Sequence, residues 1–141
     1  NWYRSGPSHE LIAGRWSQFC YEHSLMPTVD FNSVVRGHHV YMSVWHPTIG
    51  ERLMVCIERG NAHDRHAVSV QRESTVVGHV PREVSKIFKG FLMHEGEIEC
   101  EITGSRRRGN GLEVPCVYHF TGKDKTIIRL VGLLKKSGTV L

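Results

Sequence analysis

Short segments that alternate apolar and polar residues, joined by turns, dominate the chain between Val34 and Phe120. Alternation with a period of two is typical of β-strands that are buried on one face. The Asn110-Gly111 step has the composition of a tight hairpin turn, and so indicates antiparallel pairing of its flanking segments. The predicted strands are residues 34–45 (one strand, or two broken at Gly37), 52–59, 67–71, 75–80, 97–104 and 112–120.

One segment inside this run changes to a helical period. Pro81 suits the first position of a helix, and Gly96 suits the residue that ends one. Between them, apolar residues recur at i, i+3, i+4, i+7 and i+8: Val84, Ile87, Phe88, Phe91 and Leu92. We predict a helix over residues 81–95 that seals one end of the sheet and buries Ile87, Phe88, Phe91 and Leu92. The fold class is mainly β with helices, a small OB-like β-barrel rather than a parallel α/β sheet.

The segments outside this run predict two further helices. Residues 124–136 have apolar residues at helical spacing, followed by Gly138. Residues 9–23 show a similar pattern before Pro27 and predict a second helix. This helix either docks on the domain that follows or belongs to a neighbouring domain. We divide the chain into an N-terminal extension, 1–32, and a barrel domain, 33–141. Because the sequence begins at Asn1 without a methionine, we expect it to be part of a longer protein.

Composition limits the class of protein. With 141 residues, 40% hydrophobic and 23% charged, the chain has the size and content of one globular domain. No apolar run approaches the roughly 20 residues of a membrane span, so no membrane partner is expected. The four cysteines are widely spaced without a C-x-x-C pair, which favours free thiols in a reducing, intracellular compartment. The formal net charge of +4 permits nucleic acid as a partner without requiring it.

Sequence motifs for catalysis are missing. The chain has no phosphate-binding G-x-x-x-x-G-K-[ST] loop, no G-x-S-x-G elbow and no H-E-x-x-H motif. His63 and His66, with Asp64 between them, would suit a zinc ion only if their loop were helical. The preceding Gly60-Asn61 step favours a turn instead, in which Asn61 and Asp64 bond to backbone groups. We therefore expect no enzyme activity, no metal and no cofactor.

Two groups of residues could contact nucleic acid. Arg106, Arg107 and Arg108 form either a solvated hairpin tip or a phosphate contact, because arginine offers a forked pair of donors. Aromatic rings and imidazoles can stack on bases, although half of those on strands must point into the core. The candidates are Tyr41, Trp45, His63, Tyr118 and Phe120, of which Trp45 and His63 are expected to be exposed.

Three stretches of the sequence, in order, resemble the HIRAN domain family. Residues 58–70 (ERGNAHDRHAVSV) are similar to the R-x-P-x-N-P-Y-D-x-N-A-I-x-V core of that family. Residues 77–83 (VGHVPRE) are similar to the family segment that leads from a strand into the first helix. Residues 36–40 (RGHHV) fit the start of the family sequence. The resemblance runs from about Val35 to Phe120. It implies an OB-like β-barrel of the kind found in fork-remodelling and chromatin-linked ATPases, and hence a nuclear protein.

The resemblance also implies a DNA site. In a member of this family the domain captures the 3′-hydroxyl end of single-stranded DNA: an Asp holds the hydroxyl, a basic residue holds phosphate and aromatics stack on the terminal bases. The residues of this sequence that match the motif are Asn61, Asp64, His79 and Arg82, and Trp45 falls at one of two stacking positions. The other falls on Val44, or on His46 if the alignment shifts by one residue.

The sequence departs from the family pattern inside the implied site. His63 replaces the tyrosine before the Asp, Ala62 replaces a proline, and the loop after Arg59 is about two residues short. A further stacking position falls near Thr103 and Gly104, where no ring is present.

These patterns lead to one leading hypothesis and one alternative. The first is a non-catalytic, monomeric module that recognises single-stranded DNA ends within a larger DNA-repair or chromatin protein. The alternative is a protein-interaction module on the same barrel that has lost the DNA-end pocket. Beyond the matched motif positions, His46 and the three hairpin arginines complete the predicted DNA-binding residues.

Overall fold

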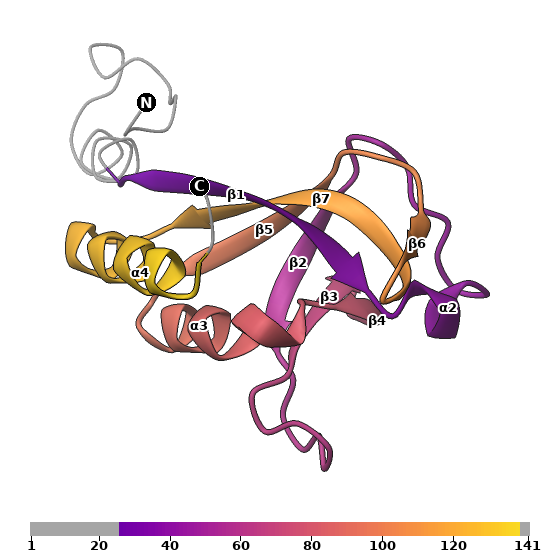
Figure 1. Ribbon diagram of the computed structural model, residues 1–141, viewed down its shortest axis with the longest axis horizontal. Helices are drawn as coiled ribbons and strands as arrows, with labels where there is room; N and C mark the ends of the chain where they lie inside the picture. The colour runs from indigo at the N-terminus through magenta and orange to yellow at the C-terminus, as the bar shows by residue number, and fades with distance from the viewer. Residues whose placement is uncertain (1–25, 139–141) are drawn as a thin grey trace, which may run out of the picture.

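A computed structural model describes residues 26–138 and shows a closed β-barrel of six strands (Figure 1). The strands follow one another around the barrel in the order β1, β4, β3, β2, β5 and β7, and β1 returns to pair with β7. The seventh strand, β6, pairs only with β7 and extends the sheet as a hairpin. The elements are β1 (Thr28–Arg36), α2 (His38–Tyr41), β2 (Arg52–Ile57), β3 (Val68–Arg72), β4 (Thr75–His79), α3 (Arg82–Met93), β5 (Glu97–Ile102), β6 (Arg107–Gly109), β7 (Gly111–Thr121) and α4 (Asp124–Lys136).

The predicted fold class is confirmed: the chain forms a small barrel with the two predicted long helices added to it. The C-terminal helix has the predicted bounds, and α3 lies within the predicted segment 81–95. The two alternating segments 67–71 and 75–80 predict a tight connection at Glu73-Ser74, and this turn is confirmed: both residues have positive φ (49° and 71°), as a type I′ hairpin turn requires. The predicted helix over 9–23 lies outside the described residues.

The prediction for residues 34–45 is confirmed as far as Arg36, with the break at Gly37, and is wrong for residues 38–45. The first strand begins earlier, at Thr28, and it pairs with β7 along its whole length, from Thr28↔Thr121 to Arg36↔Glu113. It therefore begins inside the segment that the sequence assigned to the extension. It ends at Arg36, and the next residue, Gly37, has a φ of 83° that turns the chain into the short helix α2. Residues 38–45 thus fold as a helical turn and loop rather than as a strand.

The end of α3 also differs from the prediction. We expected Gly96 to end the helix, but the helix ends at Met93 and the left-handed residue that follows it is Glu95, with φ of 64°. Gly96 is required for another reason: a Cβ atom there would overlap the ring of Phe91. The glycine therefore serves close packing between α3 and the chain that leaves it.

Aromatic rings hold α3 against the barrel. Phe88 is fully buried, and its ring centroid lies 5.0 Å from that of Tyr118 and 4.8 Å from that of Phe120. The Tyr118 hydroxyl donates a hydrogen bond of 2.7 Å to the carbonyl of Val34, so this buried polar group is satisfied. Tyr118 and Phe120 are core residues and cannot stack on a base.

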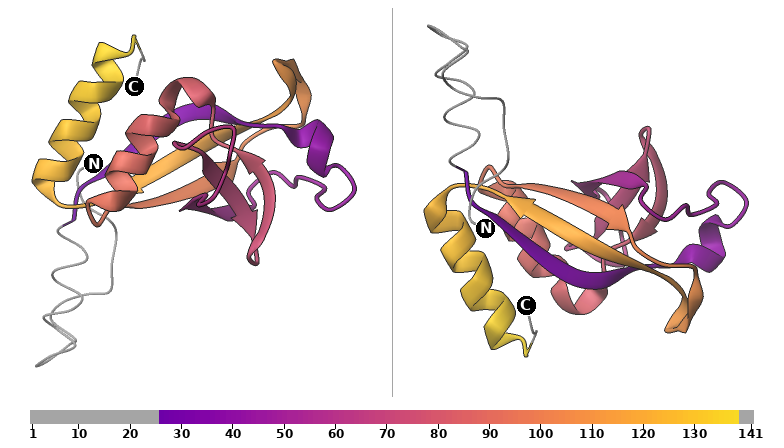
Figure 2. Two further views of the ribbon diagram at one scale, coloured as in Figure 1. Left: turned by 90° about the horizontal axis from the view of Figure 1, so that it is seen from below. Right: turned by 90° about the horizontal axis from the view of Figure 1, so that it is seen from above.

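The two long helices lie side by side on the barrel (Figure 2). As predicted, α3 buries Phe88 and Phe91, whereas Ile87 and Leu92 are only partly buried. The reason is that Ile87 faces α4, which leaves a groove between the helices. The buried face of α4 consists of Ile127, Leu130 and Leu134. No helix among residues 26–138 is long and apolar enough to cross a bilayer.

Replacing Phe88 with alanine tests how strongly the core depends on this ring. We expect Phe88→Ala to lower the free energy of unfolding by about 3–5 kcal/mol, because it removes buried surface and leaves a cavity. Met93→Ala is the matched control, since Met93 ends the same helix with 65% of its surface exposed. Chemical denaturation measures both variants. Equal, small effects would contradict the packing described.

An ion-pair bridge spans the outer face of three strands. On β7, His119 donates from Nδ1 to Asp30 on β1 (2.7 Å) and from Nε2 to Glu101 on β5 (2.8 Å). Burial acts to lower the pKa of His119, but the hydrogen bonds to the two carboxylates outweigh it and raise the pKa above the usual value. Donation from both ring nitrogens requires the protonated form of the imidazole.

The raised pKa makes the contribution of this bridge depend on pH. The stabilisation is fully present below the ordinary histidine value of about 6.5 and is lost as the pH rises through the folded-state pKa. We therefore expect the unfolding free energy of wild type to be higher than that of His119→Gln at pH 5.5. This difference should be smaller at pH 8.5. Denaturation of both proteins at each pH measures it. A difference that does not vary with pH would contradict the bridge.

Candidate nucleic-acid interface

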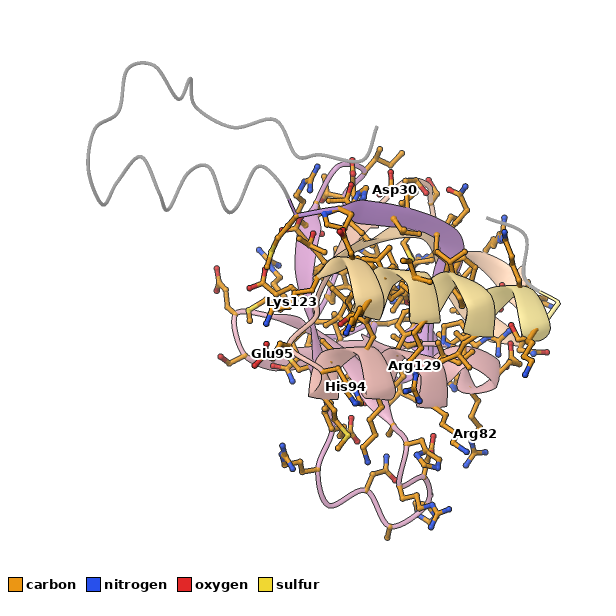
Figure 3. All side chains as sticks on the ribbon, turned by 90° about the vertical axis from the view of Figure 1, so that its left-hand side faces the viewer. Asp30, Arg82, His94, Glu95, Lys123 and Arg129 are labelled. Atoms are coloured by element: carbon orange, nitrogen blue, oxygen red, sulfur yellow. The ribbon has the colours of Figure 1, made fainter. Side chains whose placement is uncertain are left out.

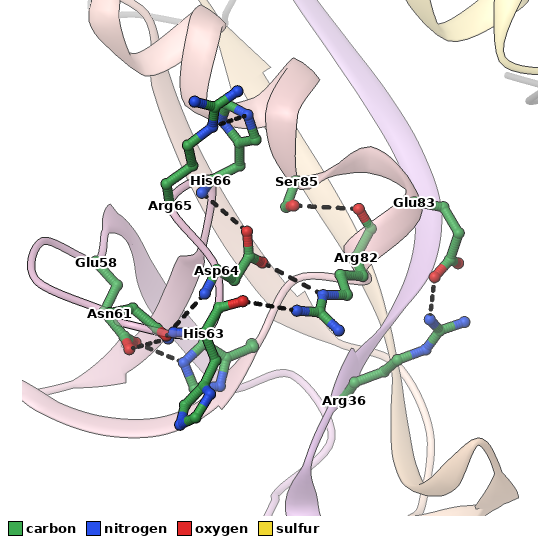
Figure 4. Close-up of polar contacts among 11 residues, drawn as sticks. Arg36, Glu58, Asn61, His63, Asp64, Arg65, His66, Arg82, Glu83 and Ser85 are labelled. Carbon is green, nitrogen blue, oxygen red and sulfur yellow. Dashed lines mark hydrogen bonds and ion pairs between the residues drawn. The ribbon is translucent and has the colours of Figure 1, made fainter.

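The loop between β2 and β3 is shaped by a single asparagine (Figure 4). The side-chain oxygen of Asn61 accepts hydrogen bonds from the backbone N–H groups of His63 (2.9 Å) and Asp64 (3.1 Å). Its Nδ2 donates to Glu58 Oε1 (2.9 Å) at the start of the loop. The loop is therefore a turn, as predicted, because Asn61 supplies the acceptors that its backbone lacks.

Glu58 ties this loop to β4. Its second carboxylate oxygen accepts from Nε2 of His79 at 2.5 Å, which orients the imidazole. The ring of Tyr41, from α2, also lies near His79, with the ring centroids 6.1 Å apart. Burial and the charge of Glu58 together raise the pKa of Tyr41. His79 is thus fixed between two elements that are far apart in the sequence.

Asp64 and Arg82 face each other across the groove that this loop forms with α3 (Figure 4). Asp64 Oδ1 accepts from the backbone N–H of His66 (2.9 Å), whereas Oδ2 lies 3.7 Å from Nε of Arg82. Arg82 also donates from Nη2 to the carbonyl of His63 (3.0 Å), yet its side chain is 71% exposed. One carboxylate oxygen and most of one guanidinium group therefore remain available to a ligand.

The groove has a volume of about 380 Å³ and brings together five of the predicted site residues. Those five are Asn61, His63, Asp64, His79 and Arg82. Arg36, Gly37, Ala67, Val68 and Val80 complete the lining. The β2–β3 loop and the residues that lead from β4 into α3 therefore form one surface. It lies at the end of the barrel where β1 and β4 meet.

Arg36 is a groove residue that we did not predict. It forms ion pairs with Glu83 on α3 and, at 3.3 Å, with Glu113 on β7. The hydrogen bond to Glu83 raises the pKa of Arg36 and lowers the pKa of the Glu83 carboxyl. The only signal in the sequence was its place beside Gly37 at the end of a predicted strand, within the RGHHV stretch.

Trp45 is not part of the groove, and the prediction that it is exposed was wrong. The side chain is fully buried, and its indole N–H lies 3.2 Å from the carboxylate of Glu51, to which it donates. The ring of His38 packs edge-on against it at 5.6 Å, and burial lowers the pKa of His38. Because residues 38–45 form a helix and a turn, Trp45 points inward. Val44 and His46, on either side of Trp45 in the chain, are both exposed.

The three hairpin arginines lie outside the groove. Arg106, Arg107 and Arg108 are all exposed, on β6 and the residue before it. Nε of Arg107 is 4.0 Å from Glu113, which also pairs with Arg36. The hairpin is therefore next to the groove, separated from it by one shared carboxylate. Among residues 26–138, no three His, Cys, Asp or Glu side chains gather as metal ligands would.

Together, the fold and the groove define a small closed β-barrel domain with a recess at one end that is lined by two arginines. By sequence, residues 30–122 match the HIRAN domain family, and the chain belongs to that family. The resemblance found in the motifs is thereby confirmed. No curated protein matches the chain by sequence.

Solved structures share the same fold. The crystal structure of the HIRAN domain of human HLTF superposes with a TM-score of 0.62 at 22% identity, covering 81% of this chain and 91% of that one. An NMR structure of the HLTF HIRAN domain gives 0.66 at 20% identity, covering 82% and 94%. The NMR structure of that domain in its DNA-bound conformation gives 0.58 at 22% identity, covering 79% and 90%.

Replacing Asn61 with alanine tests its role in shaping the loop. We expect Asn61→Ala to speed amide hydrogen exchange at His63 and Asp64 and to cost about 1 kcal/mol in unfolding free energy, since two donors lose their acceptor. Asn32→Ala, on β1 and outside the loop, is the control and should leave both amides unchanged. Unaltered exchange in Asn61→Ala would show that the turn forms without this side chain.

Proposed function

We propose that this domain is a non-catalytic DNA-binding module that captures the 3′-hydroxyl end of a single strand in the 380 Å³ groove. The observation that carries the proposal is the placement of Asp64 opposite Arg82 within that groove. A DNA-bound state of the HLTF domain supports it, because that domain shares the fold. We further propose a monomeric module of a longer nuclear protein that acts in DNA repair or on chromatin.

The chemistry of Asp64 suits a terminal hydroxyl. An ionised carboxylate only accepts hydrogen bonds, so it favours a 3′-OH and repels a 3′-phosphate. Its Oδ1 is occupied by the His66 N–H, and the 3.7 Å between Oδ2 and Arg82 leaves Oδ2 able to accept. One oxygen therefore maintains the loop while the other faces the ligand.

The remaining groove residues suit the last nucleotides. The exposed guanidinium of Arg82 can donate to the phosphate that precedes the terminal sugar. The exposed imidazole of His63 offers a stacking face smaller than a tyrosine ring. The hairpin of Arg106, Arg107 and Arg108 would contact phosphates further along the strand, because it is adjacent to the groove through Glu113.

Substitution of Asp64 tests the end preference. We expect wild type to bind dT10 ending in 3′-OH at least about tenfold more tightly than dT10 ending in 3′-phosphate, since a hydrogen bond to a charged acceptor contributes about 1.5–3 kcal/mol. Asp64→Asn retains an oxygen for the His66 N–H but removes the charge, so both ends should bind equally. Fluorescence anisotropy measures the affinities, and melting curves confirm that the variant is folded. Equal wild-type affinities would contradict end recognition.

Salt dependence tests the hairpin separately. Replacing Arg106, Arg107 and Arg108 with serine should flatten the plot of log affinity against log salt by roughly 0.7 for each phosphate that the hairpin no longer neutralises. The preference for 3′-OH should remain, because Asp64 is unchanged. The control is Lys135→Ser with Lys136→Ser, at the far end of α4, which should keep the wild-type slope. An unaltered slope in the triple variant would exclude the hairpin from the DNA path.

One observation favours the alternative, a protein-interaction module on the same barrel. In α2 and the loop that follows it, four apolar side chains are exposed: Val40, Met42, Val44 and Ile49. One of them, Val44, falls where the family resemblance implies a stacking ring. Exposed apolar side chains in one segment suit a protein partner better than DNA. Failure of the chain to bind any oligonucleotide at low salt would favour this function over DNA-end capture.

A further inference from the structure

A second and larger groove lies between α3 and α4, with a volume of about 640 Å³. It shares no lining residue with the groove proposed for DNA. The two helices run in opposite directions, since His94 at the end of α3 lies beside Lys125 at the start of α4. Figure 3 looks onto this face, with His94 and Arg129 beside the gap between the helices.

The floor of this groove is apolar. Ile87 and Phe91 come from α3, and Leu130 and Leu133 come from α4. Phe91 and Leu130 are buried, whereas Leu133 is 37% exposed and Ile87 is half-buried. The floor therefore presents aliphatic surface, while the one aromatic ring beneath it is covered and offers no face for a base.

The rim of the groove is cationic. Lys86, Lys125 and Arg129 line it, and no carboxylate does. Among residues 26–138 none of these three cations is paired with an acidic side chain, whereas Lys123 just outside the groove pairs with Glu95 (3.0 Å). The surface thus combines an apolar floor with unneutralised positive charge.

A glycine keeps the middle of the groove open. Gly90 lies in the interior of α3, where glycine is unfavourable relative to alanine, and a Cβ atom there would meet nothing within 4 Å. Packing within the chain therefore does not require this glycine. The space above it is free for a side chain of a partner.

We propose that this groove docks an acidic, amphipathic helix of another protein. An apolar floor between two helices accepts leucine-like side chains spaced i, i+3, i+4 and i+7, and the cationic rim attracts glutamates on the flanks. From Lys86 to His94 the groove spans about 12 Å, or roughly two turns of a partner helix.

Other occupants fit the charge and chemistry less well. A second copy packed groove to groove would place three cations against three. Residues 1–25 of this chain contain two arginines and two glutamates and bring no net acidic charge. Nucleic acid would match the cations, but the aromatic ring of the floor, Phe91, is buried, which leaves only the imidazole of His94 at the end of the groove as an exposed ring in the lining.

The proposal is tested with the full chain and a defined probe. The probe is a fluorescein-labelled 14-residue peptide with leucine at helical spacing and glutamate on the other face; the comparison peptide has lysine in place of glutamate. Fluorescence anisotropy should show at least tenfold tighter binding of the acidic peptide. Lys125→Glu with Arg129→Glu should weaken that binding at least tenfold. Failure of the acidic peptide to bind, or equal binding of both peptides, would overturn the proposal.

Two glycines provide matched variants. Gly90→Leu fills the groove and should abolish peptide binding without lowering the melting temperature, whereas Gly132→Leu on α4 adds the same side chain in open space outside it. Equal loss in both variants would overturn the assignment to this groove. So would competition by dT10, or a concentration-dependent dimer that Gly90→Leu dissociates. Asp64→Asn should leave peptide binding intact, because Asp64 lies in the other groove. The peptide and DNA proposals can therefore fail independently of each other.

Discussion

The close approach of β1 to β4 is the constraint on which the rest of the structure depends. A Cβ atom at Gly78 would overlap Val35 and lie 2.9 Å from the carbonyl oxygen of Arg36, so only glycine admits β1 here. The pairing of Arg36 with His79 then completes the barrel, because β1 already pairs with β7 on its other edge. Closure removes exposed sheet edges and places the end of β1 beside the β2–β3 loop.

The candidate site is a consequence of that closure. Arg36 and Gly37 come from the end of β1, His79 from the end of β4, and Arg82 from the start of α3. These elements converge only because the barrel is closed at this point. Hydrogen bonds from Asn61 and Glu58 then hold the β2–β3 loop against the same edge, which brings Asp64 opposite Arg82.

The sequence pattern predicted those helices and turns whose formation depends on residues close together in the chain. The bounds of α4 followed from its apolar spacing, and the Glu73-Ser74 turn followed from the alternating segments on either side of it. The motif residues of the loop and of the segment before α3 predicted five residues that meet in one groove. The segment 38–45 was mispredicted because its apolar spacing resembles a strand, while Gly37 and burial of Trp45 against Glu51 decide its path. Arg36 was missed because its partners Glu83 and Glu113 are 47 and 77 residues away.

The central claim, that the end of the barrel closed by β1 and β4 is the DNA surface, is tested most directly by NMR mapping. The ¹H–¹⁵N spectrum of the full chain is recorded during titration with dT10 carrying a 3′-hydroxyl. The account predicts that the largest shifts fall on the amides of residues 36–37, 61–66, 79, 80 and 82. Shifts confined to α4 or to residues 38–50, with the amides of residues 61–66 unchanged, would contradict it.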